Sequence, residues 1–140
     1  MNMKSKWKAK GILFLFMVII SSILYFSWIP DPSLASESYL PLWLLDWSNF
    51  YFNLRTAVPF IVFGVLLELW FAVTLQSAKQ KSKFYLWLRN STIALALVCL
   101  AEGGQFFILN RHPDGMDVLF GVLGSQLGFL LYYILKKVIS

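Results

Sequence analysis

Four long runs of apolar residues constrain the fold of this chain more than any other feature. They cover residues 11–29, 56–75, 90–109 and 118–135. Each is long enough to cross a hydrocarbon core about 30 Å thick as an α-helix that rises about 1.5 Å per residue. Hydrophobic residues make up 59% of the 140 residues and charged residues 14%, against about a quarter charged in soluble domains. Because lipid leaves no partner for unpaired backbone groups, we predict a single all-α domain over residues 1–140, a four-helix transmembrane bundle.

The basic residues lie between the apolar runs and predict the direction of the helices. Ten of the twelve fall on one side of four antiparallel spans, and Arg55 and Arg111 fall on the other. The ten are Lys4, Lys6, Lys8, Lys10, Lys79, Lys81, Lys83, Arg89, Lys136 and Lys137. Because positive residues favour the cytoplasmic side, we expect both termini in the cytoplasm and a multi-pass protein of the plasma membrane. The net charge of +5 is thus a topology signal, and we expect no nucleic-acid partner.

The N-terminal run has a second interpretation. A basic start, an apolar stretch and the sequence Ser33-Leu34-Ala35 are also the parts of a cleaved signal peptide. The run is longer than the apolar part of a usual signal peptide, which is about 7–15 residues. We therefore favour its retention as a membrane anchor.

Residues 40–52, with the sequence LPLWLLDWSNFYF, form an amphipathic segment in the first external loop. Apolar and aromatic residues recur at helical spacing, while Asp46, Ser48 and Asn49 lie elsewhere on the helical wheel. A helix rich in Trp and Tyr suits the membrane interface. Two roles stay open: an aromatic belt that anchors the loop, and a lid over an outward-facing site.

Glu68 and Glu102 interrupt the second and third apolar runs. A carboxylate in the middle of a bilayer costs about 2.5–3.5 kcal/mol on insertion scales, so each needs a proton, a partner or water. From the predicted helix ends, Glu68 lies roughly 18 Å below the outer surface and Glu102 roughly 10 Å below it. The two acids therefore need not be neighbours, and a shared-proton pair is not expected. Ionisable residues within membranes mark functional sites by default, which makes Glu102 the leading candidate.

Four polar residues gather around the end of the third run and the start of the fourth. Glu102 and Gln105 are spaced i,i+3 and share a helix face. Arg111 follows in a turn rich in Asn, Pro, Asp and Gly, and Asp117 begins the fourth run. A tight outer turn brings these residues together, so we predict that they converge on an outward-opening polar pocket with Arg55 as a second cation.

Three of these residues also have a simpler explanation. Asp117 caps the fourth helix, Arg111 pairs with Asp114 or with a lipid phosphate, and Gln105 hydrogen-bonds another helix. In the fourth run, Gly124 and Gly128 form a G-x-x-x-G motif that permits close helix approach. A single cysteine and a single histidine argue against a disulfide and a conventional zinc site, and we expect no metal and no cofactor.

The motif Glu102-x-x-Gln105, Arg111, Asp117-Val118 and a glycine-rich last helix resembles the VanZ-like family of small bacterial membrane proteins. The stretch NLRTAVPFIVFG, residues 53–64, resembles a second family element. The resemblance covers residues from 53 to about 135. An asparagine usual in the family shortly after the Asp-Val pair is missing, since Phe120 and Gly121 occupy that position.

The resemblance implies a bacterial cell-envelope protein connected with resistance to glycopeptide antibiotics of the teicoplanin type or with envelope lipids. Our leading hypothesis is an outward pocket that binds a lipid-linked or glycopeptide-like anionic ligand through Arg55, Glu102, Gln105, Arg111 and Asp117. Glu102 would orient Arg111 or act as acid or base. One alternative is a hydrolase or transferase acting on such a lipid, with Glu102 or Asp117 as general base. Another is a structural or assembly subunit whose polar residues lock the helices.

Overall fold

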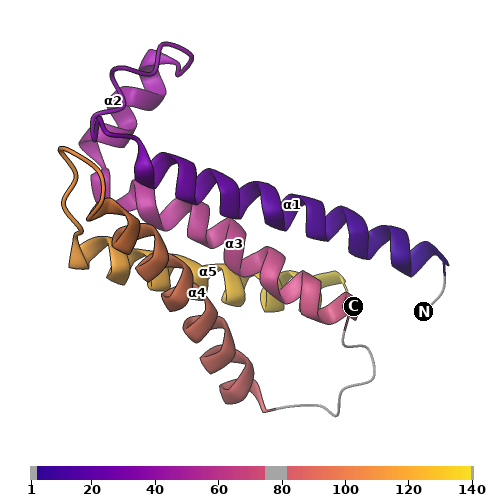
Figure 1. Cartoon of the computed structure of the whole chain (residues 1–140). Coiled ribbons are helices and arrows are strands. Elements are labelled where there is room, and N and C mark those ends of the chain that lie inside the picture. The colour runs from indigo at the N-terminus through magenta and orange to yellow at the C-terminus, as the bar shows by residue number, and fades with distance from the viewer. Residues whose placement is uncertain (1–2, 75–81, 140) are drawn as a thin grey trace.

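The computed structural model describes residues 3–74 and 82–139. The elements in this part of the chain are all α-helices: α1 (Met3–Trp28), α2 (Leu42–Phe50), α3 (Phe52–Thr74), α4 (Lys83–Gln105) and α5 (Gly115–Ile139) (Figure 1). All but α2 are long and apolar enough to cross a membrane. The structure thus confirms the predicted all-α class with four candidate spans.

The third helix differs most from its predicted bounds of 90–109. α4 begins at Lys83, because the Ser82 hydroxyl accepts a hydrogen bond from the Tyr85 amide and caps the helix. It ends at Gln105, after which the Phe107 amide turns back onto the Gly104 carbonyl at 3.2 Å. The prediction was wrong at both ends: the helix includes polar residues before the apolar run, and it stops before the run does because the chain turns after Gln105.

The other spans are extended in the same way at their polar ends. α3 begins at Phe52 rather than at residue 56, and α5 covers Gly115–Ile139 rather than 118–135. Arg89, which the sequence assigned to the flank between two spans, lies inside α4. Lys79 and Lys81, which the same argument used, lie outside the described residues.

α3 and α5 form the closest helix pair, and three glycines permit their approach. A Cβ atom at Gly64 would meet the Ser125 carbonyl oxygen, and one at Gly124 or Gly128 would meet a carbonyl oxygen of α3. The close approach predicted from the G-x-x-x-G motif is therefore confirmed. It sets the register that brings the start of α5 beside the start of α3.

The core lies between α3 and α4, with α1 along one side. Phe60 and Phe63 of α3 pack against Val98 of α4, and Ile23 of α1 completes this buried cluster. α1 meets α4 near its C-terminal end, where the Trp28 indole donates to the Ala101 carbonyl at 3.0 Å. These contacts hold the end of α1 close to the end of α4, where the candidate site lies.

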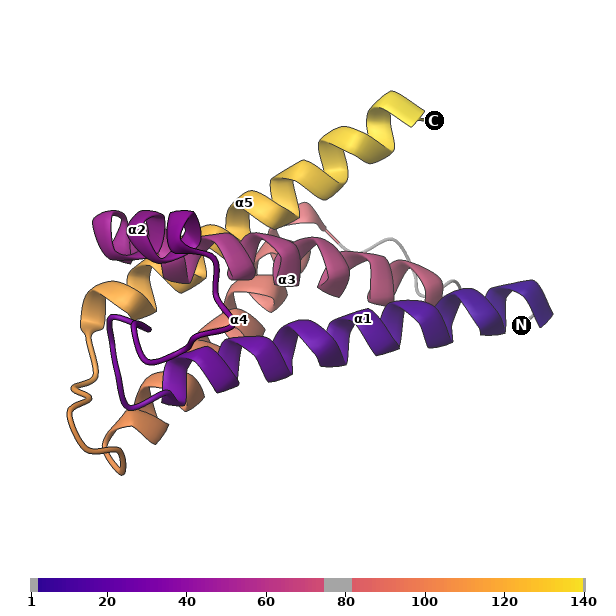
Figure 2. The same cartoon turned by 90° about the horizontal axis from the view of Figure 1, so that it is seen from above.

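The two ends of the bundle differ in structure. α2 and the connection between α4 and α5 lie at one end in both views, while the start of α1 and the end of α5 lie toward the other end (Figures 1 and 2). Six described lysines belong to helix ends at the end of the bundle away from α2: Lys6, Lys8, Lys10, Lys83, Lys136 and Lys137. The predicted antiparallel arrangement of the four spans therefore agrees with the structure.

Candidate ligand-binding site

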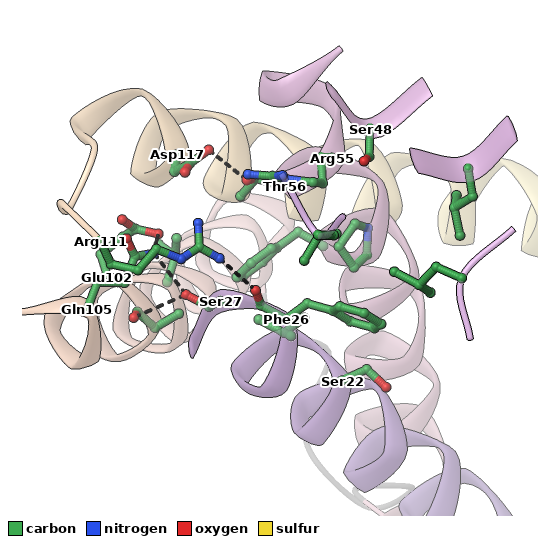
Figure 3. Close-up of a pocket in the computed structure, with 18 of the residues that line it drawn as sticks. Ser22, Phe26, Ser27, Ser48, Arg55, Thr56, Glu102, Gln105, Arg111 and Asp117 are labelled. Atoms are coloured by element: carbon green, nitrogen blue, oxygen red, sulfur yellow. Dashed lines mark hydrogen bonds between the residues drawn. The ribbon is translucent and has the colours of Figure 1, made fainter. Parts of the chain in front are cut away.

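A cavity of about 270 Å³ lies at the α2 end of the bundle (Figure 3). All five predicted ligand-binding residues line it, and they come from three helices and one connection: Arg55 from α3, Glu102 and Gln105 from α4, Asp117 from α5, and Arg111 from the connection before α5. Apolar side chains of α1, α2, α3 and α4 complete the wall, among them Ile23, Phe26, Leu44, Trp47, Phe60 and Val98. The structure thus brings together the residues that the sequence placed in one pocket; their role in binding remains a prediction.

Glu102 is buried, with 7% of its surface exposed, and both of its carboxylate oxygens have neutral donors. Oε1 accepts a hydrogen bond from the Gln105 side-chain amide at 3.0 Å, and Oε2 accepts one from the Asp114 amide at 3.0 Å. The same Gln105 amide also donates to the Ser27 hydroxyl of α1 at 3.0 Å. The acid is therefore tolerated because the residue one helical turn on and the connection between α4 and α5 supply its donors.

Arg111 is oriented by backbone carbonyls at the end of α1. Its Nε donates to the Ile29 carbonyl at 2.7 Å and its Nη2 to the Phe26 carbonyl at 3.0 Å. Burial, and after it the positive charge of Arg55, lowers the pKa of the Arg111 guanidinium. A guanidinium stays protonated at neutral pH even so, and the cavity therefore keeps this positive charge.

Arg55 and Asp117 approach the cavity from α3 and α5. Arg55 Nη1 donates to the Pro32 carbonyl at 2.7 Å, and the Thr56 hydroxyl donates to Asp117 Oδ1 at 2.6 Å. Asp114, and not Asp117, caps α5, since its Oδ1 accepts a hydrogen bond from the Met116 amide at 2.8 Å. The simpler explanation of Asp117 as a helix cap was therefore wrong, and its carboxylate faces the cavity (Figure 3).

No direct pair joins the four charged side chains of the cavity. The one ion pair among residues 3–74 and 82–139 joins Arg89 to Glu68. Arg111 forms no direct bond with Asp114 among the described residues, so the interpretation that these two residues pair is wrong. The carbonyls of α1 hold Arg111 instead, because the connection between α4 and α5 packs against the end of α1.

The hydroxyl groups of the site were not predicted from the sequence. Thr56, Ser27, Ser22 and Ser48 line the cavity, and the first two bond directly to its charged or amide residues. A hydroxyl within an apolar run carries little signal, since many such groups simply bond their own helix, as Ser22 does with the Val18 carbonyl at 2.9 Å. For Thr56, the one sequence feature that pointed to the site is its position directly after Arg55.

Glu68 belongs to a second polar cluster away from the cavity. The Arg89 Nη2 atom donates to both of its carboxylate oxygens, at 2.8 and 2.9 Å. The Asn90 amide donates to Glu68 Oε1 at 3.3 Å and accepts at its own oxygen from the Ser125 hydroxyl at 2.7 Å. This cluster joins α3, α4 and α5, and it provides the partner that the sequence argument required for Glu68.

Comparison with known proteins yields no relative. No protein-family profile matches this sequence, and no curated protein or solved structure matches it. Within the described part of the chain, no group of three His, Cys, Asp or Glu side chains is placed to hold a metal ion. The chemistry of the site therefore has to be argued from its own residues: two guanidinium groups, two carboxylates, one amide and several hydroxyls beside an apolar wall.

Proposed function

We propose that this protein is an integral membrane protein of the bacterial cell envelope that binds the anionic headgroup of a lipid-linked molecule in the cavity beside α2. The observation that carries the proposal is the cavity itself. It has a wall of apolar side chains and two arginines, neither of which forms an ion pair with any described residue. Such a site fits a ligand with a charged headgroup and an apolar chain.

The two arginines supply the affinity for the anion. Arg55 uses one nitrogen and Arg111 uses two, all to neutral carbonyls, so neither positive charge is neutralised by a bonded carboxylate. A guanidinium presents several donors in a planar fork that matches phosphate or carboxylate oxygens. Both groups are already held in place by the backbone, which reduces the entropy lost when a ligand binds.

The apolar wall supplies the site for the chain of the ligand. The cavity is lined, together with residues of α1 and α3, by four residues in and just before α2: Leu40, Leu44, Leu45 and Trp47. α2 thus covers one side of the cavity, which supports the role of a lid. Its outer face carries Leu42, which is 78% exposed, and the turn after α4 carries Phe107, which is 92% exposed. We infer that both lie in the outer membrane interface, with the termini in the cytoplasm.

The proposed connection with the cell envelope rests on the VanZ-like resemblance of Glu102, Gln105, Arg111 and Asp117. Resistance to teicoplanin-type glycopeptides is the role that this resemblance suggests. A ligand of that setting, such as a lipid-linked envelope precursor, has the phosphate and the chain that the cavity suits. The membrane enzyme remains the alternative, with Glu102 or Asp117 as the base.

The test is binding of a defined anionic lipid by the full-length protein in detergent, followed by native mass spectrometry. We expect phosphatidylglycerol to be retained and a diacylglycerol with the same acyl chains to be lost. Arg55→Gln and Arg111→Gln should each weaken retention roughly tenfold or more, because each removes charged hydrogen bonds. Lys136→Gln, an exposed change at the opposite end of α5, is the matched control and should leave retention unchanged.

Two outcomes contradict the proposal. The first is equal retention of phosphatidylglycerol and diacylglycerol. The second is unchanged retention in both arginine variants while their melting temperatures stay at the wild-type value. If an arginine variant loses both lipid binding and its folded structure, the result favours the alternative in which these residues only hold the helices together. Chemical change of a lipid-linked substrate during incubation, abolished by Glu102→Gln, would favour the enzyme.

A further inference from the structure

The cavity presents charges of both signs without pairing them. Arg55 and Arg111 bond to backbone carbonyls, Asp117 to the Thr56 hydroxyl, and Glu102 to two amides. All four charged side chains line the same cavity, so all four can act on one ligand. An anion alone would satisfy the arginines and place its charge near two carboxylates.

The two carboxylates differ in how many further hydrogen bonds their oxygens can accept. Glu102 accepts one hydrogen bond on each oxygen. Asp117 accepts only the Thr56 hydroxyl, on Oδ1, among the described residues. The unused Oδ2 makes Asp117 the better acceptor for a donor on the ligand. It lies on the first turn of α5, across the cavity from α1, where Arg111 is tied (Figure 3).

We propose that the headgroup of the ligand carries a protonated amine as well as an anion. The anion binds Arg55 and Arg111, and the ammonium donates N–H hydrogen bonds to Asp117, with Glu102 contributing charge. This inference rests on the proposed function and narrows its ligand class to zwitterionic lipids with a primary amine. A ligand of this kind neutralises both pairs of charges in a cavity of about 270 Å³.

Three lipids with the same acyl chains test the inference in competition: phosphatidylethanolamine, phosphatidylglycerol and phosphatidylcholine. We expect the full-length protein in detergent to retain phosphatidylethanolamine roughly tenfold better than either of the others, by native mass spectrometry. Phosphatidylglycerol lacks the positive charge. Phosphatidylcholine carries a positive charge with no N–H group, so it cannot donate to Asp117.

Asp117→Asn is the decisive variant. It keeps the shape of the side chain and an oxygen for the Thr56 hydroxyl, so the fold should hold, and it removes the negative charge. The preference for phosphatidylethanolamine over phosphatidylglycerol should fall from roughly tenfold to about equal. Asp46→Asn, an exposed change on α2 that does not line the cavity, should keep the preference.

The inference is overturned if phosphatidylethanolamine binds no better than phosphatidylglycerol or phosphatidylcholine, or if Asp117→Asn leaves the preference unchanged. If phosphatidylglycerol and phosphatidylethanolamine bind equally and both need the arginines, the proposed function stands and the amine recognition falls. If none of the three lipids is retained better than diacylglycerol, both fall. Soluble phosphoethanolamine as a competitor reports whether the headgroup alone is recognised.

Discussion

The Glu68 cluster and the cavity beside α2 use the same kinds of residue in opposite ways. In the Glu68 cluster, a carboxylate and a guanidinium pair directly at 2.8 Å, and Asn90 and Ser125 beside them are fully buried. In the cavity, Arg55, Arg111, Glu102 and Asp117 each bond to neutral groups and leave open space between them. A paired cluster joins helices, and an unpaired one leaves charge available for a ligand.

The difference follows from where the helices are close together. Glycines hold α3 against α5, and Asn90 and Ser91 of α4 reach α5 through Ser125 and Gln126. There the side chains must satisfy one another. At the α2 end, loops and the ends of helices supply spare backbone groups, which bond the charged residues one at a time. The predictions below test whether one cluster serves stability and the other binding.

The largest expected effect is on the paired cluster. Glu68→Ala leaves Arg89, whose side chain is only 14% exposed, without its carboxylate, and we expect the free energy of unfolding in detergent to fall by about 3–5 kcal/mol. Arg89→Leu combined with Glu68→Met should recover most of that loss, since paired burial is often neutral to replace with apolar residues. Thermal denaturation of the three proteins measures this. If Glu68→Ala is as stable as the wild-type protein, the pair does not stabilise the fold.

The next effect concerns the hydroxyl group of Ser125. Ser125→Ala removes the donor to the Asn90 side-chain oxygen in a fully buried place, which should cost about 1–3 kcal/mol of unfolding free energy. Thr92→Ala is the matched control. Its hydroxyl bonds only within its own helix and is exposed, so its loss should leave the melting temperature near wild type. Equal melting of the two variants would show that the Asn90 contact contributes nothing.

A matched pair of isosteric changes sharpens the comparison. Glu102→Gln should cost about 1 kcal/mol or less, because the amide oxygen still accepts from Asp114 and the cavity admits water. Glu68→Gln should cost clearly more, because it removes the charge that Arg89 requires. Melting temperatures measured side by side decide the point. A larger loss for Glu102→Gln than for Glu68→Gln would reverse the assignment of roles.

The smallest expected effect is the pH response of the segment before α2. Hydrogen bonds from the Ser33 hydroxyl and from the Ser36 and Ser33 amides lower the pKa of Asp31 to about 2 from 3.8. A lowered pKa means that this contribution to stability is complete above pH of about 4 and is lost as the pH falls toward 2. Carbon-detected NMR titration of the Asp31 carboxyl should give its midpoint near pH 2. A midpoint near 4 would show that these bonds do not form.

Much of the fold follows from the sequence because length and composition leave few solutions. The four spans and the neighbourhood of Glu102 and Gln105 needed only helical spacing and one tight turn. Arg89 was assigned to a flank because its partner Glu68 lies 21 residues away and on another helix. A hydropathy profile scores residues along the chain, so it cannot predict an ion pair between two helices.

The missed details of the site are contacts with backbone groups or contacts between helices. Arg111 bonds to carbonyls of Phe26 and Ile29, and a backbone carbonyl leaves no mark in a residue pattern. The Thr56–Asp117 bond depends on the register of α3 against α5, which the glycine contacts set. Both become visible only once the helices are packed.

The most direct test of the central claim is an experimental structure of the full-length protein in a lipid nanodisc that contains phosphatidylethanolamine. The claim is that the unpaired charges beside α2 form a binding site for a lipid headgroup. We expect density in the cavity that contacts the guanidinium groups of Arg55 and Arg111 and continues along the apolar wall. A cavity closed by its own side chains, with Arg111 paired to Glu102 or Asp117, would contradict the claim.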